Sequence, residues 1–209
     1  MNKELVKRVL SSIILLPLVF YFLQAGSFFS IFLTIVCFIT ACYEWNRMNK
    51  NNNNKIFGFI FLLFAFYTFY YLSNELFLLI FVILICISTD IGGYVFGKTF
   101  KGPKLTKISP NKTYAGMVGG YLLSLVCLSI ITNYIDYLGS YFKLFLITVL
   151  ISTVSQTGDI IVSSFKRKAG VKNTGNLIPG HGGLLDRIDG MIFAVPTFYL
   201  IKITGFINI

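Results

Sequence analysis

The sequence predicts an all-α, polytopic integral membrane protein with about seven or more transmembrane helices. Of its 209 residues, 56% are hydrophobic and only 12% are charged, whereas soluble domains carry about 25% charged residues. The mean hydropathy is +0.76. Several apolar runs also reach the roughly 17–25 residues that a helix needs to cross a bilayer. Lipid is therefore the expected solvent for most of the chain.

Seven apolar segments are the predicted spans. They are 9–24, 28–43, 56–72, 76–96, 114–132, 141–162 and 188–206. An interruption of the sixth near "SQTGD" (155–159) is left open, because this stretch is polar and contains a glycine. The polar run "NKNNNNK" (49–55) is interpreted as a solvated linker. The chain, 1–209, is expected to form a single membrane-embedded domain, with N-terminal spans in 9–72 and a motif-bearing half in 76–206.

The basic residues predict the orientation of these spans, because Lys and Arg accumulate in cytoplasmic connections. Sixteen of the 18 lie at the N-terminus or in alternate connections, and the intervening short connections contain none. The N-terminus and both long basic loops are therefore expected on the cytoplasmic side of a cell inner membrane or cytoplasmic membrane. The C-terminus is expected on the opposite side.

Two of the cytoplasmic segments, 97–113 and about 159–187, exceed the ~4–6 residues of an ordinary connection, and long ordered loops often carry function. The first contains five Lys and no acidic residue. It is either a solvated loop that touches anionic lipid headgroups or a site for phosphate groups, which Lys charges and free backbone N–H groups suit. Ser109 is expected to cap the helix of the fifth span, where anions also bind well.

Four aspartates near the cytoplasmic ends of spans are candidate metal ligands: Asp90, Asp159, Asp186 and Asp189. A carboxylate at membrane depth costs roughly 2.5–3.5 kcal/mol on insertion scales. An ion pair with Lys would explain one such residue, whereas several near one face predict a cation between them. Asp186 and Asp189 are three residues apart, which places both on one face of a helix. Oxygen ligands favour Mg²⁺ or Mn²⁺, with substrate phosphates completing the coordination; a second cation is compatible with four carboxylates.

Carboxylates for a metal beside Lys and Arg for phosphate are typical of phosphoryl or nucleotidyl transfer. His181 is the single His of the chain and lies between glycines in "PGHGG". Those glycines let the backbone approach a ligand closely, so a ligand or substrate contact is favoured over a structural role. The polar cluster at the membrane edge predicts one lipid substrate and one water-soluble phosphate compound, and no nucleic acid.

Segment 163–189, "SSFKRKAGVKNTGNLIPGHGGLLDRID", resembles the signature of the phosphatidate cytidylyltransferases, also called CDP-diacylglycerol synthases. "TDIGGYVFGKTFKGPKLTKISPNKTYAGMVGG" is similar to the family's Asp-containing helix and Ser-Pro-x-Lys-Thr loop. "KRVLSSIILLP" and "EWNRM" resemble its opening spans. The resemblance covers most of the chain, which is short for the family. Asn173 stands where the family pattern has Asp, so a charge-dependent role there is in doubt.

The resemblance implies cytidylyl transfer from CTP to phosphatidate, which gives CDP-diacylglycerol and pyrophosphate in phospholipid biosynthesis. The implied catalytic residues are Asp186, Asp189, Lys172 and Lys112. The implied substrate contacts are Ser109, Lys112, Thr113, Lys166, Arg167, Lys172, His181, Gly182, Gly183 and Arg187. The implied ligands of Mg²⁺ are Asp159, Asp186 and Asp189, with Asp90 as a further metal or structural partner. A homodimer is compatible with the sequence.

Other classes stay open on the residues alone. Another membrane-embedded, metal-dependent lipid phosphotransferase would use similar groups, although the Asp-Gly-x-x-Ala-Arg pattern of the CDP-alcohol phosphotransferases is absent from the sequence. A transporter can also hold intramembrane Asp, but it would more often show paired interrupted helices in two matching halves. A purely structural membrane protein would not need the one-sided carboxylates. Turnover of CTP by purified protein separates these classes.

Overall fold

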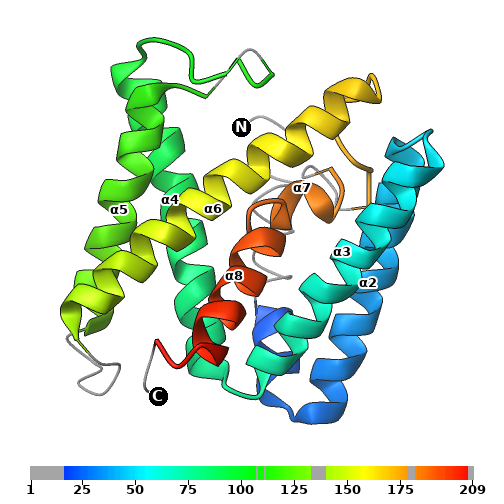
Figure 1. Ribbon diagram of the computed structural model, residues 1–209, viewed down its shortest axis with the longest axis horizontal. Helices are drawn as coiled ribbons and strands as arrows, with labels where there is room; N and C mark the ends of the chain where they lie inside the picture. The colour runs from blue at the N-terminus through cyan, green and yellow to red at the C-terminus, as the bar shows by residue number, and fades with distance from the viewer. Residues whose placement is uncertain (1–16, 107, 111, 133–139, 178–181, 207–209) are drawn as a thin grey trace. The chain divides into compact units, whose positions relative to one another are not determined.

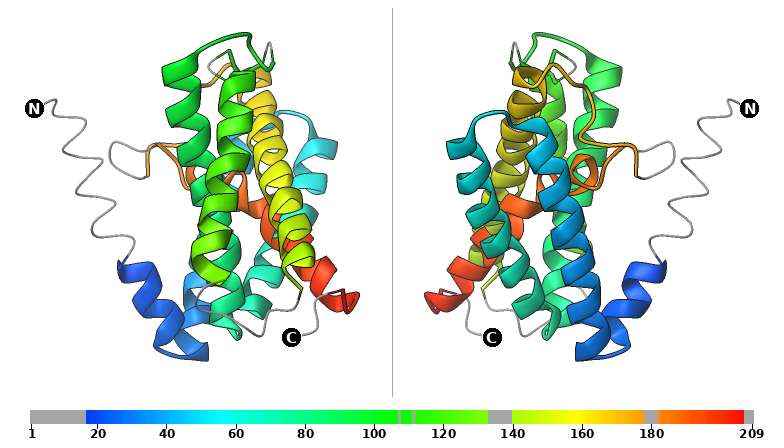
Figure 2. Two further views of the ribbon diagram at one scale, coloured as in Figure 1. Left: turned by 90° about the vertical axis from the view of Figure 1, so that its left-hand side faces the viewer. Right: turned by 90° about the vertical axis from the view of Figure 1, so that its right-hand side faces the viewer.

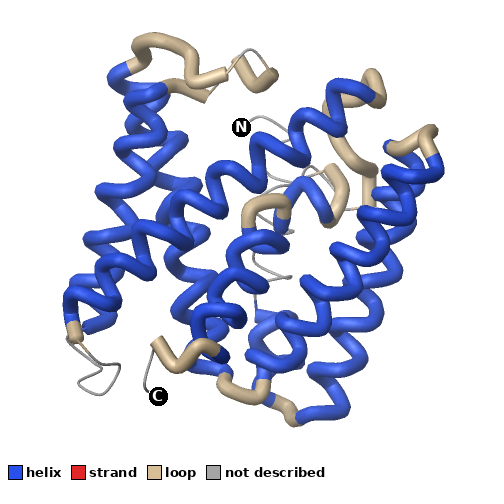
Figure 3. The backbone as a smooth tube through the Cα atoms, viewed as in Figure 1, coloured by secondary structure: helices blue, strands red, loops and turns tan. Residues whose placement is uncertain are grey.

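A computed structural model describes residues 17–106, 108–110, 112–132, 140–177 and 182–206. The regular structure among these residues is helical (Figure 3), apart from isolated bridge residues, which include the antiparallel pair Lys104 and Thr113. The chain forms two compact units. Unit 1 is Met1–Leu76 with Phe165–Asp189, and unit 2 is Phe77–Ser164 with Gly190–Ile209. Most of the signature segment therefore groups with the N-terminal helices.

Unit 1 contains a pair of long antiparallel helices, α2 (Ser27–Met48) and α3 (Asn52–Ser73), which lie side by side in Figures 1 and 2. Residues 17–24 are also helical. The side chain of Asn51 accepts a hydrogen bond from the backbone N–H of Asn53 at 3.0 Å. Asn is a favoured N-cap, so α3 begins inside the polar run. The expectation of a solvated linker that extends to Lys55 was therefore wrong.

Trp45 holds the end of α2 within unit 1. A side chain at Gly58 of α3 would overlap the indole ring of Trp45. The indole Nε1–H donates to the carbonyl oxygen of Asn54 at 3.1 Å, which satisfies its polar atom in an apolar setting. The ring also meets Phe165 with 4.8 Å between centroids. These contacts fix the beginning of the signature segment against α2.

Unit 2 is built from membrane-length helices that approach one another closely. Its helices are α4 (Leu76–Phe100), α5 (Tyr114–Thr132), most of α6 (Tyr141–Lys168) and α8 (Met191–Ile203). α4 and α5 run side by side (Figures 1 and 2), and a Cβ at Gly119 would lie only 2.8 Å from the carbonyl oxygen of Gly92. Small residues allow such approach between membrane helices. The hydroxyl of Thr89 donates to Ser152 Oγ at 2.9 Å, which joins α4 to α6.

Five described helices, α2 to α6, are long and apolar enough to span a membrane. α5 has the predicted bounds, and the other four are longer than predicted. α6 is continuous for 28 residues, so the suggested interruption near "SQTGD" was wrong; one Gly in a helix interior costs only about 1 kcal/mol. Of the two remaining predicted spans, the first half of 9–24 lies outside the described residues and the second half, 17–24, is helical. The other, 188–206, contains α8, a 13-residue helix with Pro196 inside it, and the count of seven stays a prediction.

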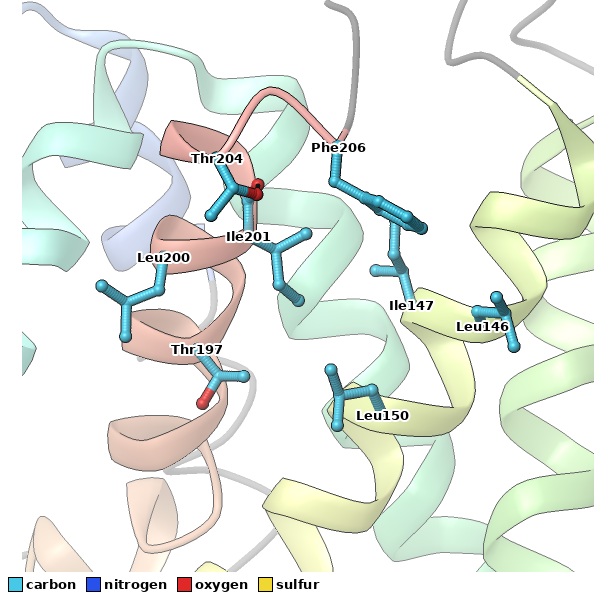
Figure 4. A pocket seen from close by; sticks show the side chains of 8 residues that line it. All are labelled: Leu146, Ile147, Leu150, Thr197, Leu200, Ile201, Thr204 and Phe206. Atoms are coloured by element: carbon cyan, nitrogen blue, oxygen red, sulfur yellow. Dashed lines mark hydrogen bonds between the residues drawn. The ribbon is translucent and has the colours of Figure 1, made fainter.

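An apolar cavity of about 380 Å³ lies between α6 and α8 within unit 2 (Figure 4). Its lining side chains are Leu146, Ile147, Leu150, Thr197, Leu200, Ile201, Thr204 and Phe206. The α6 residues among them lie in the N-terminal half of the helix. Asp159 is ~13 Å further along the helix axis than Leu150, at 1.5 Å per residue. The cavity is therefore separate from the candidate catalytic residues of unit 2.

Candidate active site

The signature segment folds around the carboxylate of Asp186, which lies on the single turn of α7 (Leu185–Ile188). Its Oδ1 accepts a hydrogen bond from Lys166 Nζ at 2.8 Å. Its Oδ2 accepts two more, from the backbone N–H of Thr174 at 2.8 Å and of Gly183 at 3.0 Å. Three donors from distant parts of the segment therefore converge on one side chain.

These donors control the charge of Asp186. Burial by itself would raise the pKa of the carboxyl group, because a low-dielectric environment disfavours the anion. The hydrogen bond from Lys166, the two backbone N–H groups and the positive charge of Lys166 outweigh burial, and they hold the pKa below its ordinary value of 3.8. Asp186 is thus anionic at neutral pH, which is the form that a carboxylate needs to bind a cation.

Lys166, in the last turn of α6, joins two carboxylates. Its Nζ lies 2.8 Å from Asp186 Oδ1 and 3.6 Å from Asp189 Oδ2, and its side chain is only 9% exposed. Asp189 follows α7 in helical conformation (φ −57°, ψ −37°). Both aspartates therefore face one ammonium group, as their three-residue spacing suggests. The sequence-based role of Lys166 as a phosphate contact stays a prediction.

Gly182 is required by the shape of the loop. Its φ is +89°, a left-handed conformation that residues with a Cβ rarely adopt. A Cβ at this position would also lie 2.7 Å from Asp186 Oδ2. The predicted close approach of backbone at these glycines is thus an approach to Asp186, and contact of Gly182 or Gly183 with substrate stays a prediction. His181 lies outside the described residues.

Two residues that hold this loop were missed by the sequence analysis, Thr174 and Glu44. The hydroxyl of Thr174 donates to Glu44 Oε2 at 2.7 Å, across 130 residues of sequence. Glu44 lies on α2 and is 1% exposed. The available signal was its place in "EWNRM", a stretch quoted only for its likeness to an opening span.

Three further cations predicted to contact phosphates, Arg167, Lys172 and Arg187, have exposed side chains. Arg167 Nη1 donates to the carbonyl oxygen of Val171 at 3.2 Å, which steadies the turn after α6. Exposed guanidinium and ammonium groups in the segment that also carries Asp186 suit a water-soluble phosphate compound. Their contact with phosphate stays a prediction.

Unit 2 holds a second carboxylate–lysine pair, in which Lys112 forms a salt bridge with Asp159. The hydroxyl of the next residue, Thr113, accepts a hydrogen bond from the N–H of Gly116 at 3.1 Å and so caps α5. The expectation that Ser109 caps this helix was therefore wrong. The carbonyl oxygen of Ser109 instead accepts from the backbone N–H of Lys112 at 3.0 Å, which shapes the basic loop.

The four predicted metal ligands are divided between the units. Asp186 and Asp189 belong to unit 1, whereas Asp90, on the exposed side of α4, and Asp159 belong to unit 2. Within the described part of the chain, no three His, Cys, Asp or Glu side chains gather as a metal-binding group. Mg²⁺ typically uses one or two protein carboxylates plus substrate phosphates, so a pair is a sufficient protein contribution. The metal role of all four stays a prediction.

The fold and the geometry together define a multi-pass helical membrane protein with a buried carboxylate–lysine cluster in a glycine-containing segment. A family model described as the cytidylyltransferase family matches residues 6–75 and 56–204. The chain belongs to this family.

Relatives named phosphatidate cytidylyltransferase agree with this assignment. One from Rickettsia typhi is 35% identical over 210 residues, which cover 94% of this chain and 91% of the relative. One from Rickettsia prowazekii is 41% identical over 138 residues, or 63% of this chain and 60% of the relative. One from Staphylococcus saprophyticus is 39% identical over 132 residues, or 63% of this chain and 51% of the relative. The chain thus spans about half the length of the staphylococcal relatives that it matches.

Proposed function

We propose that this protein transfers a cytidylyl group from CTP to phosphatidate, giving CDP-diacylglycerol and pyrophosphate. Membership of the cytidylyltransferase family and the names of the relatives support the choice of reaction and substrates. The structural observation that carries the proposal is the arrangement of Asp186, Lys166 and Asp189, two carboxylates held around one buried ammonium. This cluster lies in the segment that resembles the family signature.

The proposed reaction is a single displacement at phosphorus. A phosphate oxygen of phosphatidate forms a bond to the α-phosphorus of CTP, the bond from that phosphorus to the bridging oxygen of the β-phosphate breaks, and pyrophosphate leaves. No covalent bond to the protein is formed. The protein contributes mainly by orienting two anionic substrates and by neutralising their charge.

Asp186 and Asp189 are the proposed ligands of Mg²⁺, and the donor chemistry fits this ion. Asp186 is anionic, its Oδ1 accepts from Lys166, and a carboxylate oxygen has two lone pairs. A bound divalent cation would neutralise the triphosphate and the leaving pyrophosphate. Mn²⁺ has the same ligand preference. A second cation at Asp159 and Asp90 is a separate proposal.

The remaining residues are proposed to bind phosphate groups. Arg167, Lys172 and Arg187 are exposed cations of the signature segment, and Lys172 is also proposed to assist catalysis. The proposed substrate contacts further include Ser109, Lys112, Thr113, His181, Gly182 and Gly183. Each Lys or Arg supplies charge-assisted hydrogen bonds, which are shorter and stronger than neutral ones.

The proposed location is a cell inner membrane or cytoplasmic membrane, which the five candidate spans support. The N-terminus and both basic loops would face the cytoplasm, where a water-soluble nucleotide is available. Phosphatidate would enter from the bilayer. A homodimer is a further expectation that the described contacts do not address.

Purified protein incubated with phosphatidate, Mg²⁺ and labelled CTP, ATP, GTP or UTP tests the function. The expected result is label in the lipid phase from CTP labelled at the α-phosphate or the base, and none from the γ-phosphate. Transfer of a γ-phosphate label would indicate a lipid kinase-type phosphotransferase instead. No lipid-soluble label, together with movement of phosphatidate or nucleotide across vesicles that contain the protein, would favour a transporter.

A further inference from the structure

The conformation of the signature segment is set by a carboxylate that lies far outside it. Glu44 of α2 is 1% exposed, and each of its oxygens accepts hydrogen bonds from this segment. Oε1 accepts from the backbone N–H of Leu184 at 2.8 Å. Oε2 accepts from the N–H of Leu185 at 2.9 Å and from the hydroxyl of Thr174 at 2.7 Å. Three donors thus compensate the burial of one charge.

Two of these donors lie at the start of α7, the N–H of the flanking residue Leu184 and the N–H of Leu185. The first N–H groups of a helix have no acceptor within that helix, and α7 begins at Leu185. Its flanking residue Leu184 makes no capping hydrogen bond with its side chain. Glu44 therefore supplies, from α2, the acceptor that the local sequence does not provide. It fixes the start of the turn that carries Asp186.

Glu44 and Asp186 are joined through shared backbone. Thr174 donates its hydroxyl to Glu44 and its N–H to Asp186. Further along the segment, Gly183 donates its backbone N–H to Asp186, and the next residue, Leu184, donates its backbone N–H to Glu44. Both carboxylates are therefore bonded to the same two parts of the segment, Thr174 and the Gly183–Leu184 backbone. A displacement at Glu44 must therefore move the two N–H groups that hold Asp186.

We propose that Glu44 is a positioning residue, which sets the place and direction of the Asp186 carboxylate through Thr174 and the Gly183–Leu185 backbone. The inference rests on the proposed function only for its kinetic part. Replacement of a hydrogen-bonding partner behind a metal ligand typically lowers metal affinity or activity by 10- to 100-fold. Glu44 acts on Asp186 through other residues, so it should change the Mg²⁺ requirement more than the binding of phosphatidate.

The test uses Glu44→Gln in the full chain, reconstituted in lipid nanodiscs. Gln keeps the length of the side chain but presents an NH₂ group to N–H or O–H donors, so at least one hydrogen bond is lost. Amide hydrogen exchange is expected to accelerate at Thr174 and Gly183, neither of whose N–H groups bonds Glu44. The half-saturating Mg²⁺ concentration is expected to rise roughly 10- to 100-fold, with the KM for phosphatidate unchanged.

Leu62→Ala is the matched control, because Leu62 is a fully buried core residue of α3 in the same unit. It should lower the unfolding midpoint without changing exchange at Thr174 and Gly183 or the Mg²⁺ requirement. The positioning role is refuted if Glu44→Gln leaves amide exchange at Thr174 and Gly183 and the Mg²⁺ requirement unchanged. It is also refuted if Glu44→Gln alters these two quantities no more than Leu62→Ala does. If the unmutated protein transfers no cytidylyl group, the proposed function fails, and amide exchange alone decides the role of Glu44.

A second pair of variants keeps the proposal testable if Glu44→Gln does not fold. Thr174→Val removes one donor to Glu44 and keeps the backbone N–H that bonds Asp186, whereas Thr174→Ser retains the hydroxyl. Thr174→Val should accelerate exchange at Gly183 and raise the Mg²⁺ requirement, and Thr174→Ser should match the unmutated protein. Equal behaviour of the two variants would overturn the proposal.

Discussion

The carboxylate of Asp186 shows how a buried side chain is kept in its charged form. Burial opposes its ionisation, and one ammonium and two backbone N–H groups more than compensate. Each of these hydrogen bonds involves a charged group, which makes it stronger than a neutral one. The side chain is therefore anionic and fixed in direction before any substrate binds, which is the preorganisation that charge-neutralising catalysis needs.

Asp186→Asn is expected to abolish cytidylyl transfer, because the amide keeps the size of the side chain and removes its charge. A loss of at least ~100-fold, or about 2.7 kcal/mol of transition-state stabilisation, is expected at saturating Mg²⁺, with the protein still folded. The measurement is lipid-soluble CDP product. Glu75→Gln, between α3 and α4, is the control and should retain activity. A rate for Asp186→Asn within about threefold of the unmutated enzyme (~0.7 kcal/mol) would contradict a role for Asp186 as a metal ligand.

Lys166→Met tests the same cluster through the pH dependence of stability. In the unmutated protein the pKa of Asp186 is lowered, so its contribution to stability is present above pH 3.8 and is lost as pH falls through the folded pKa. Without Lys166, two of the causes that lower the pKa of Asp186 are removed and this pKa rises, so acidification should narrow the stability difference between the variant and the unmutated protein. Removal of one partner of a buried pair costs about 3 kcal/mol or more, and this difference should be largest near pH 7.

The readout is the unfolding midpoint of Lys166→Met at pH 7 and at pH 5. Lys168→Met, in the same turn of α6 but exposed, should show little change at either pH. A difference between Lys166→Met and the unmutated protein that grows on acidification would show that Lys166 does not stabilise the Asp186 anion.

At the scale of the helices, close packing in unit 2 depends on glycine. A Cβ at Gly119 of α5 would collide with Phe96 and lie 2.8 Å from the carbonyl oxygen of Gly92, both on α4. In an open helix Gly→Ala is stabilising by about 1 kcal/mol. Overpacking typically costs 1–3 kcal/mol, and backbone cannot yield as a flexible side chain does, so Gly119→Ala should be destabilising. The measurement is the free energy of unfolding in detergent, with Val118→Ala, at an exposed position of α5, as the control. A stabilising effect of Gly119→Ala would mean that α4 and α5 do not approach this closely.

The sequence predicts the helices of this protein well, because their dominant signal is local. Apolar runs of membrane length correspond to α2 through α6, and α5 has the predicted bounds. The errors lie where polar residues favour a helix that hydropathy does not mark. Asn51 caps α3 inside a polar run, and α6 continues through a polar stretch as far as Lys168.

In the candidate site, the sequence predicts that Asp186 and Asp189 share a face, but it does not predict which groups bond them. Asp186 and Asp189 were found from their spacing and from the signature. The partner of Asp186 is 20 residues away in sequence, and the hydroxyl bonded to Glu44 is 130 residues away. No periodicity encodes contacts at such separations, because they arise only when α2 and the signature segment pack in one unit. From the sequence, Glu44 was therefore interpreted only as part of an opening span.

At the scale of the whole molecule, the orientation in the membrane stays a prediction, and the contacts within each unit bear on where its basic connections lie. In unit 1, Glu44 and Trp45, near the C-terminal end of α2, contact the signature segment and its approach. The basic connection after α2 and the basic segment after α6 therefore lie at one end of that unit. In unit 2, Lys112 of the five-lysine loop pairs with Asp159, towards the C-terminal end of α6. Unit 1 thus has two basic connections at one end, an arrangement that retention of Lys and Arg on the cytoplasmic side would require.

This orientation predicts which face of the membrane each loop occupies. In a background without Cys37, Cys42, Cys86 and Cys127, Lys104→Cys and Lys172→Cys should react with a membrane-impermeant thiol reagent only from the cytoplasmic side. Asn74→Cys, at an exposed site in the short connection between α3 and α4, should react only from the opposite side, which controls for reagent leakage. Both loops carry exposed lysines, and inserting a Lys into the bilayer centre costs roughly 2.5–3.5 kcal/mol, so neither loop can exchange sides readily. Labelling of position 104 or 172 from the outside, with Asn74→Cys labelled as expected, would place that loop away from cytoplasmic CTP and would exclude it from the proposed reaction.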